Sequence, residues 1–139
     1  MQNTNFYPVY HSSRISCWHT SDIPSSLRPY IGYFFESSSE RTEEFKSFDR
    51  KYKNAIKKKL PKGWSIYAWR QNHFESSATL RTPDGRFVFL SYSDVRYDTN
   101  GWMTHILVRE MEHDRDWRGG RNRYTDLVNL TEDLENLTA

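Results

Sequence analysis

The sequence predicts an α+β domain in which a long amphipathic helix packs on an antiparallel meander of about four strands, followed by a short C-terminal helix. Three observations lead to this prediction. Apolar residues recur at steps of three or four over residues 40–60, strand-like segments separated by turn signals follow over 64–111, and leucines recur at helical spacing after residue 125. Because 139 residues fit one domain, we expect residues 1–139 to form a single unit.

Residues 1–36 are predicted to form an irregular segment, because they are rich in serine and interrupted by Pro8, Pro24 and Pro29. The same segment carries many aromatic residues, and a disordered arm would not hold so many rings. We therefore expect it to pack on the sheet. Residues 30–35 fit a short strand.

The predicted helix has clear start and stop signals. Ser37 followed by Glu40 fits a capping box at its N-terminus. Lysines crowd its last turn, where cations suit the negative end of the helix dipole, and Pro61 and Gly63 end it. The apolar stripe consists of Phe45, Phe48, Tyr52, Ile56 and Leu60.

Four strands are expected over about 64–69, 77–81, 86–92 and 104–111. The sequence Thr-Pro-Asp-Gly at 82–85 is typical of a hairpin turn, and Asn-Gly at 100–101 marks another. In the first strand, alternation would place Trp64, Ile66 and Ala68 on one face and Tyr67 and Trp69 on the other. Residues 86–92 are apolar on both faces, which predicts a central strand that is covered twice.

The fourth strand should direct Ile106 and Val108 inward. After it, Thr125 is a suitable N-cap for the C-terminal helix. The leucines that define this helix are Leu127, Leu130, Leu134 and Leu137.

Composition limits the class of protein. Hydrophobic residues make up 36% of the chain and the mean hydropathy is −0.90, whereas aromatic residues reach 16%. We expect some of these rings to lie at the surface as contact residues. The single cysteine, Cys17, allows neither an intramolecular disulfide nor a thiolate zinc cluster. The N-terminal residues do not resemble a signal peptide and no apolar segment is long enough to span a bilayer, so we expect a cytoplasmic protein.

Basic side chains form a second row along the predicted helix, within a net charge of only +2. At ~100° per residue the row falls within an arc of about 60°, beside the apolar stripe. Such a row suits a phosphate backbone or an acidic protein groove, and the alternative is an ordinary solvated helix face. These candidate partner-binding residues are Lys46, Arg50, Lys53 and Lys57.

The segment 117–124 combines arginines, two glycines and two flanking rings. Glycines let a backbone approach a phosphate, arginines supply forked donors, and rings stack on bases. The alternative is a loop whose arginines pair with Asp114 and Asp116. The candidate partner-binding residues here are Trp117, Arg118, Arg121, Arg123 and Tyr124.

Acidic residues alternate just before this segment. If the chain stays extended, Glu110, Glu112, Asp114 and Asp116 project from one side, and converging carboxylates can hold Mg²⁺ for phosphodiester chemistry. A surface lattice of charges is the alternative reading. The five histidines have no metal-ligand spacing, so no resident metal or cofactor is predicted.

Asp94 and Arg96 follow the predicted central strand. We interpret them as an ion pair that closes a loop, with a functional pair at a sheet edge as the alternative.

Several segments together resemble small uncharacterised proteins of phages and plasmids in Gram-positive bacteria. They are LPKGW, DGRFVFLSYSDVRY, NGW, ILVRE and DWRGGRNRYTDL, over roughly residues 45–127. The resemblance implies a mobile-element accessory protein. Proteins of that kind often block host defence machinery, and anti-CRISPR proteins are the obvious class.

A second resemblance concerns PVYHSS at 8–13 and YIGYF at 30–34, which are similar to the first two strand blocks of ADP-ribosyltransferases. It implies that His11 binds the nicotinamide ribose and that Tyr33 is the stacking ring. Ser12 replaces the glycine of that family, and the catalytic glutamate has no clear place, although Glu110 or Glu112 is conceivable.

These observations favour a binding protein over an enzyme. We expect an inhibitor of a host defence complex, with a CRISPR effector nuclease as the specific candidate and guide RNA, target DNA or an acidic protein face as the contact. A nucleic-acid-binding regulator, a small mono-ADP-ribosyltransferase and a Mg²⁺-dependent nuclease are the alternatives. The aromatic content also makes a homodimer plausible.

Overall fold

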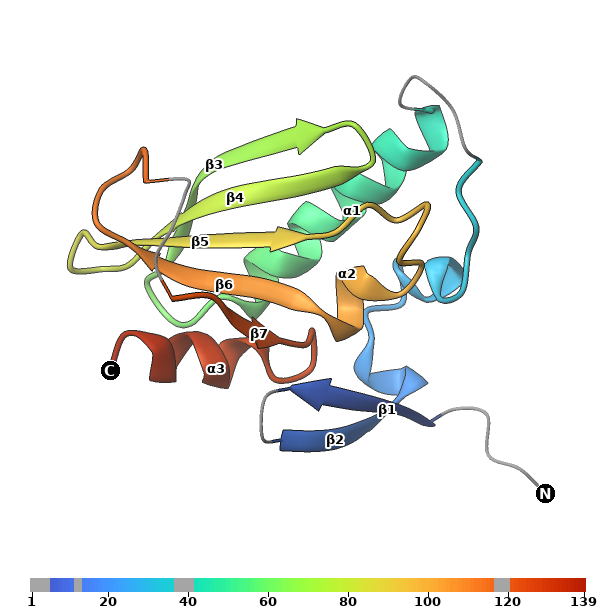
Figure 1. Cartoon of the computed structure of the whole chain (residues 1–139), viewed down its shortest axis with the longest axis horizontal. Helices are drawn as coiled ribbons and strands as arrows, with labels where there is room; N and C mark the ends of the chain where they lie inside the picture. Colours follow the sequence, from blue (N-terminus) through green and yellow to red (C-terminus); the bar gives the residue numbers. More distant parts are fainter. Residues whose placement is uncertain (1–5, 12–13, 37–41, 117–120) are drawn as a thin grey trace.

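The computed structural model describes residues 6–11, 14–36, 42–116 and 121–139, with side chains from residue 20 onward. It confirms the α+β class (Figure 1). Five antiparallel strands form a meander in the order β3-β4-β5-β6-β7. Their bounds are β3 Ser65–Asn72, β4 Glu75–Arg81, β5 Phe87–Tyr92, β6 Ile106–Met111 and β7 Arg123–Thr125.

The long helix α1 spans Glu43–Lys59, three residues shorter at its start than predicted. Its N-cap is Thr42, whose hydroxyl accepts a hydrogen bond from the Phe45 N–H at 3.2 Å. The expected capping box, Ser37 and Glu40, lies outside the described residues. The C-terminal end agrees with the prediction, since Leu60 is the C-cap and proline follows.

The apolar stripe of α1 packs on the sheet as expected. Phe45, Phe48, Tyr52 and Ile56 are fully buried. The Tyr52 hydroxyl donates a hydrogen bond to the Trp102 carbonyl oxygen at 2.8 Å, which ties the helix to the segment between β5 and β6.

One charged residue, Asp49, lies inside this apolar interface with only 1% of its surface exposed. Its carboxylate accepts four hydrogen bonds from side chains on three strands. The donors are Trp69 Nε1 at 2.8 Å, Gln71 Nε2 at 2.7 Å, Ser76 Oγ at 2.6 Å and Tyr92 Oη at 2.8 Å. Asp49 therefore fixes α1 against β3, β4 and β5 at a single point.

The hairpin between β4 and β5 has the predicted turn. Gly85 has φ +87° and donates its N–H to the Thr82 carbonyl oxygen at 3.0 Å, and the Thr82 hydroxyl accepts from the Arg86 N–H at 2.9 Å.

The predicted alternation along the first strand is wrong. A register shift between Ile66 and Ala68 marks a β-bulge, so that both Ile66 and Trp69 pack against the core while Tyr67 is 49% exposed. An extra residue in one strand reverses which side chains face inward beyond it.

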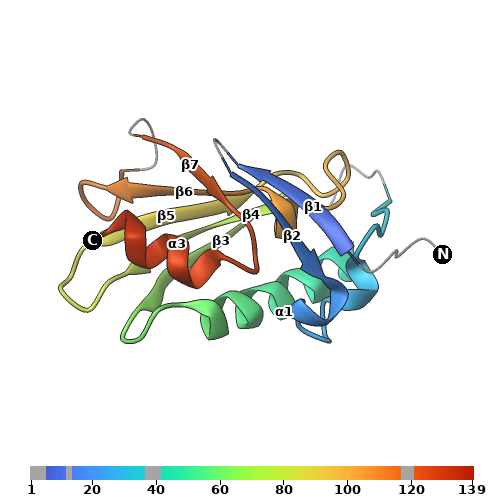
Figure 2. The same ribbon diagram turned by 90° about the horizontal axis from the view of Figure 1, so that it is seen from below.

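β5 is central, as predicted, but the expectation that both its faces are covered is wrong. Val88, Leu90 and Tyr92 face the core, whereas Phe87 and Phe89 on the other face remain partly exposed. Figures 1 and 2 show α1 and the short helix α3 on the same side of the sheet. Within the described residues, the second face is covered only by its own side chains and neighbouring loops.

The segment expected to turn at Asn100-Gly101 instead begins a short helix, α2, over Gly101–Thr104. This helix buries Trp102 and Met103 and leads directly into β6. Ile106 and Val108 of β6 point inward, as predicted.

The C-terminal region differs from the prediction in two ways. Part of the expected loop forms a fifth strand, β7, and Thr125 belongs to this strand rather than capping a helix. The helix α3 begins later, over Leu130–Leu137, with Asn129 as its N-cap. The Asn129 N–H bonds to Asp126 Oδ1 at 2.8 Å, and Leu130, Leu134 and Leu137 are buried.

The N-terminal region is less irregular than expected. β1 (Phe6–His11) and β2 (Arg14–His19) form a separate two-stranded antiparallel sheet. Thr20–Asp22 and Arg28–Tyr30 form 3₁₀ turns. The expected strand over 30–35 is absent, because the second of these turns includes Tyr30 and residues 31–36 lack regular structure. The rings of Tyr30 and Phe35 pack on Phe48 of α1 with centroids 5.0 and 5.4 Å away, so their aromatic contacts go to the helix rather than to the sheet.

No helix in the ranges that the structure describes combines the length and the apolar character needed to cross a membrane.

We predict that Asp49→Ala destabilises the fold by roughly 3 kcal/mol, because four donors, among them the buried Ser76 and Tyr92 hydroxyls, lose their acceptor together. Urea unfolding followed by circular dichroism measures this change. The neighbouring exposed Arg50→Ala serves as control and should stay within about 0.5 kcal/mol of the wild type. An Asp49→Ala protein as stable as this control would contradict the role assigned to Asp49.

We also predict a loss of stability at alkaline pH. Burial raises the pKa of Tyr52 well above 10, and burial with the nearby Asp49 charge does the same for Tyr92. Because both phenols release their protons more readily in the unfolded chain, the stability they contribute is complete below about pH 10 and is lost as pH rises beyond it. Phenolate absorbance during an alkaline titration should show two tyrosines that ionise only on unfolding; ionisation of every tyrosine near pH 10 in an intact fold would contradict this.

Candidate functional site

The basic row predicted on the helix exists on the surface of α1. Arg50, Lys53 and Lys57 are exposed, and Lys46 is partly exposed. Lys46 Nζ pairs with Glu43 Oε1 at 3.1 Å, whereas the other three make no hydrogen bond or ion pair with described residues. We call Lys46, Arg50, Lys53 and Lys57 the α1 ridge.

The second predicted patch is only partly described. Trp117 and Arg118 lie outside the described residues. Arg121 and Arg123 are exposed and pair with no acid among the described residues, so the expected alternative of pairing with Asp114 and Asp116 does not hold for them. Tyr124 is 39% exposed.

The structure does not join these two patches into one surface. Tyr124 lies opposite Leu107 in the β6–β7 ladder, and Leu107 lies opposite Ser91 in β5. Neighbouring Tyr92 points the other way, toward Asp49 of α1. Tyr124 therefore projects from the face of the sheet opposite α1.

The alternating acids do not form the extended row expected of a Mg²⁺ site. β6 ends at Met111, and the chain turns over 113–116 with the Asp116 N–H bonded to the His113 carbonyl oxygen. Asp116 accepts from the Glu112 N–H at 3.0 Å, and Asp114 accepts from the Tyr67 hydroxyl at 3.1 Å. Nowhere in the described ranges do three or more His, Cys, Asp or Glu side chains gather as metal ligands.

Asp94 and Arg96 form the expected ion pair, with Arg96 Nη2 2.7 Å from Asp94 Oδ2. Burial is the largest single effect on the Asp94 carboxyl and raises its pKa. The hydrogen bonds and the charge of Arg96 together outweigh burial, so the pKa of Asp94 is lowered. The guanidinium also lies 4.4 Å from the centre of the buried Phe74 ring. This geometry supports the structural interpretation of the pair.

Fewer aromatic rings reach the surface than the composition suggested. Seven of the described rings are buried, among them Phe48, Tyr52 and Trp102. The four exposed ones, Phe34, Tyr67, Tyr97 and Tyr124, are dispersed along the chain. Some rings therefore lie at the surface, as expected, but among the described residues they do not gather into one patch, and most of the others help to fill the core because aliphatic residues are scarce.

The strand that the transferase resemblance implies for its second block is absent, because residues 30–34 do not form a strand. Tyr33 packs on Tyr30 and Phe35 and donates a hydrogen bond to Glu44, so its ring is already engaged. His11 lies at the end of β1, and its side chain is outside what the structure describes.

The open face of the sheet has two different halves. At one end the large side chains Phe87, Phe89 and Arg109 fill the surface, and the Arg109 guanidinium lies 5.1 Å from the centre of the Phe89 ring. At the other end the side chains are small: Ser77 in β4, Ser91 in β5 and Ser93 just after β5.

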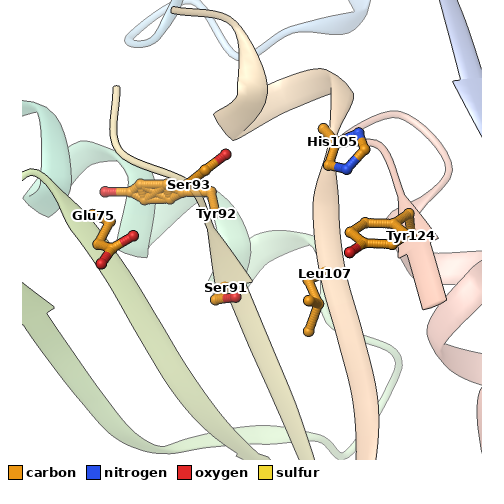
Figure 3. A pocket seen from close by; sticks show the side chains of 7 residues that line it. All are labelled: Glu75, Ser91, Tyr92, Ser93, His105, Leu107 and Tyr124. Atoms are coloured by element: carbon orange, nitrogen blue, oxygen red, sulfur yellow. The ribbon is translucent and has the colours of Figure 1, made fainter. Parts of the chain in front are cut away.

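A hollow of about 310 Å³ lies over the serine half of this face (Figure 3). Figure 3 shows Glu75 on one side, the rings of His105 and Tyr124 on the other, and Ser91 and Leu107 on the floor between them. An adjoining hollow of about 200 Å³ shares Glu75, Ser91 and Tyr92. We call the first one the serine hollow; its lining residues are Glu75, Ser91, Tyr92, Ser93, His105, Leu107 and Tyr124.

Among the described residues, Glu75 brings the only acidic side chain to either hollow, and no lysine or arginine lines them. Burial, followed by the Asp94 charge, raises the pKa of Glu75, and His73 opposes this effect. The Glu75 carboxylate has no hydrogen bond or ion pair with described residues. A partly buried carboxylate without a partner is a cost to the fold.

The serine hollow lacks the contacts that nucleophilic catalysis needs. A nucleophile must lie within hydrogen-bond reach of its base, and no hydrogen bond joins Ser91 or Ser93 to Glu75 or His105. Ser93 Oγ instead donates to Asp98 Oδ2 at 3.1 Å.

Sequence reasoning missed Glu75, Ser91, Ser93, His105 and Leu107 as a group. The signal that was available is the change from Phe87 and Phe89 to Ser91 and Ser93 along one face of a single strand. The other members come together only through the pairing of β4, β5 and β6.

Comparison of the chain with protein-family models, with curated proteins and with solved structures gives no match.

We predict that Glu75→Gln stabilises the protein at pH 7. The raised pKa means that the folded state disfavours the charged carboxylate, so the wild type loses stability as pH rises through and above the ordinary glutamate pKa of 4.5. The neutral amide avoids this loss. Thermal unfolding should give a higher Tm for the variant at pH 7 and a smaller difference at pH 3; a lower Tm at pH 7 would show that the carboxylate has a stabilising partner.

Proposed function

We propose that this protein is a non-catalytic binding protein that docks through the α1 ridge on a nucleic-acid-loaded host complex and blocks it. The observation that carries the proposal is the row formed by Arg50, Lys53 and Lys57, three exposed cations without a partner among the described residues. Exposed cations of this kind are free to neutralise an anionic partner.

The chemistry of the ridge fits phosphates. From Lys46 to Lys57 the helix rises about 16 Å, at 1.5 Å per residue. Residues 50–62 contain seven lysines and arginines and no acid, and the only acid immediately before them, Asp49, points into the core. Beyond Lys46, which pairs with Glu43, the row has no exposed acid and can follow a nucleic-acid backbone without repulsion.

The nature of the host complex is an expectation from the resemblance to phage and plasmid proteins. A CRISPR effector nuclease is the specific candidate, because it holds guide RNA and target DNA. The α1 ridge would contact that nucleic acid, or an acidic protein face beside it. A mimic of DNA would instead present acids, and α1 presents the opposite charge.

A nucleic-acid-binding regulator is the second candidate, favoured by Arg121 and Arg123, which are also exposed and unpaired among the described residues. Such a protein binds naked nucleic acid, and its affinity falls steeply with salt. For four phosphate contacts the slope of log K against log salt would be roughly −3 on single strands.

Affinity purification of the tagged protein from a bacterial lysate, with and without nuclease treatment, separates these candidates. The inhibitor should recover a protein complex whose protein subunits remain after nuclease treatment. Recovery of DNA or RNA alone would refute the inhibitor and support the regulator.

We predict that the double variant Lys53→Glu, Lys57→Glu recovers the partner at least tenfold less well, because two attractive charges become repulsive. The matched control is Arg81→Glu, Arg115→Glu, which makes the same change of net charge at two exposed residues away from α1. This control should recover the partner within about threefold of wild type. Quantitative mass spectrometry of the eluates measures both, and equal losses in the two variants would contradict a specific role for the ridge.

A further inference from the structure

The serine hollow contains an unsatisfied charge that the proposed function does not use. Glu75 is partly buried at the start of β4, and its carboxylate has neither a hydrogen bond nor an ion pair with described residues. The neighbouring acid, Asp94, is already held by Arg96. A ligand that brings a cation to Glu75 would offset the cost of burying this carboxylate.

The register of the sheet sets Glu75 opposite an aromatic wall. Ser76 pairs with Tyr92, and Tyr92 pairs with Ile106. One residue further along each strand, Glu75, Ser93 and His105 therefore form one row across the open face. Neighbouring strands are about 4.8 Å apart, so the backbones of Glu75 and His105 are separated by roughly 10 Å, with a serine between them.

The wall itself consists of two rings in contact, whose planes are tilted by 43° to each other. The rings of His105 and Tyr124 have centroids 4.3 Å apart, and Tyr124 is 39% exposed. Leu107 forms the apolar part of the floor beside them, as Figure 3 shows. A flat cation inserted from solvent meets a carboxylate on one side and ring faces on the other.

We propose that the serine hollow is a docking site for an arginine side chain of a protein partner. The guanidinium forms a forked ion pair with Glu75, and its flat face and aliphatic stem lie against Tyr124 and Leu107. Arginine suits these neighbours better than lysine, because its planar group both pairs with a carboxylate and stacks on a ring.

Charge and shape select this occupant over the others. Because Glu75 is the only acidic or basic side chain other than His105 among the described lining residues, the hollow repels phosphate and other anions. Its volume of about 310 Å³ is at the lower limit of small-molecule pockets, and much of its lining is partly exposed. A site of this size, open on one face of a sheet, fits one side chain projecting from a larger partner.

This inference is independent of the proposed function. The serine hollow lies on the face of the sheet opposite α1, so variants of the α1 ridge leave it intact. Loss of ridge binding and loss of arginine binding are therefore separate results.

The test uses nuclear magnetic resonance titration of the ¹⁵N-labelled full chain with an arginine-containing heptapeptide, acetyl-Gly-Ser-Gly-Arg-Gly-Ser-Gly-amide. We expect saturable shifts at the amides of Glu75, Ser91, Ser93, His105 and Tyr124. The same peptide with citrulline, the neutral analogue of arginine, should bind roughly tenfold more weakly, because it lacks the charge-assisted hydrogen bonds. Lysine in that position should give an intermediate affinity.

Two variants locate the site. Glu75→Gln should weaken binding of the arginine peptide by about tenfold, and Tyr124→Ala by severalfold. Glu110→Gln, which removes an exposed carboxylate elsewhere on the sheet, is the matched control and should leave the affinity unchanged. Amide spectra of each variant without peptide show whether the fold is retained.

Three outcomes would overturn the proposal. The first is an absence of saturable shifts at these residues. The second is a lack of discrimination: the wild type binds the arginine and citrulline peptides equally, or the arginine peptide binds wild type and Glu75→Gln equally. The third is tighter binding of free acetyl-arginine amide or spermidine than of the peptide, which would indicate a small-molecule site.

Discussion

The carboxylate of Asp49 is the constraint on which the rest of the structure depends. It is a formal charge with 1% exposure inside an interface of phenylalanines, and it is tolerated because neutral donors from three strands surround it. An apolar stripe alone allows a helix to slide or rotate on a sheet, whereas a carboxylate with four fixed donors has one position. The register of α1 on β3, β4 and β5 follows from that position.

This constraint determines which surfaces remain available for binding. With Asp49 held inward, the next residue, Arg50, and the basic side chains that follow it at helical spacing face outward. With Tyr92 bonded to Asp49, its neighbours Ser91 and Ser93 face the opposite side of the sheet. One buried interaction therefore separates a cationic helix surface from a small hollow that contains an acid, and the two surfaces suit partners of opposite charge.

The sequence alone was sufficient for the class of fold, for α1 and for the hairpin at Thr82–Gly85, because each has a strong local signal: a period of three to four residues, or turn residues with a specific conformation. It was insufficient for β7, which has three residues and follows an arginine-rich segment that resembles a loop. The bulge beside Tyr67 reversed the orientation of Trp69, and no local pattern indicates such an insertion. The ridge residues were predicted from the helix period. The serine hollow depends on pairing across four strands, β4 to β7, and no local pattern in the sequence predicts that pairing.

The central claim is that the outward face of α1 contacts the partner, and lysine footprinting tests it most directly. The purified protein and its complex are acylated under identical conditions, and the modification of each lysine is quantified by mass spectrometry. The account predicts that Lys53 and Lys57 become protected in the complex, while Lys51, on the flank of α1 beside Tyr30, keeps its reactivity. Equal reactivity of Lys53 and Lys57 in the free and bound states would contradict it.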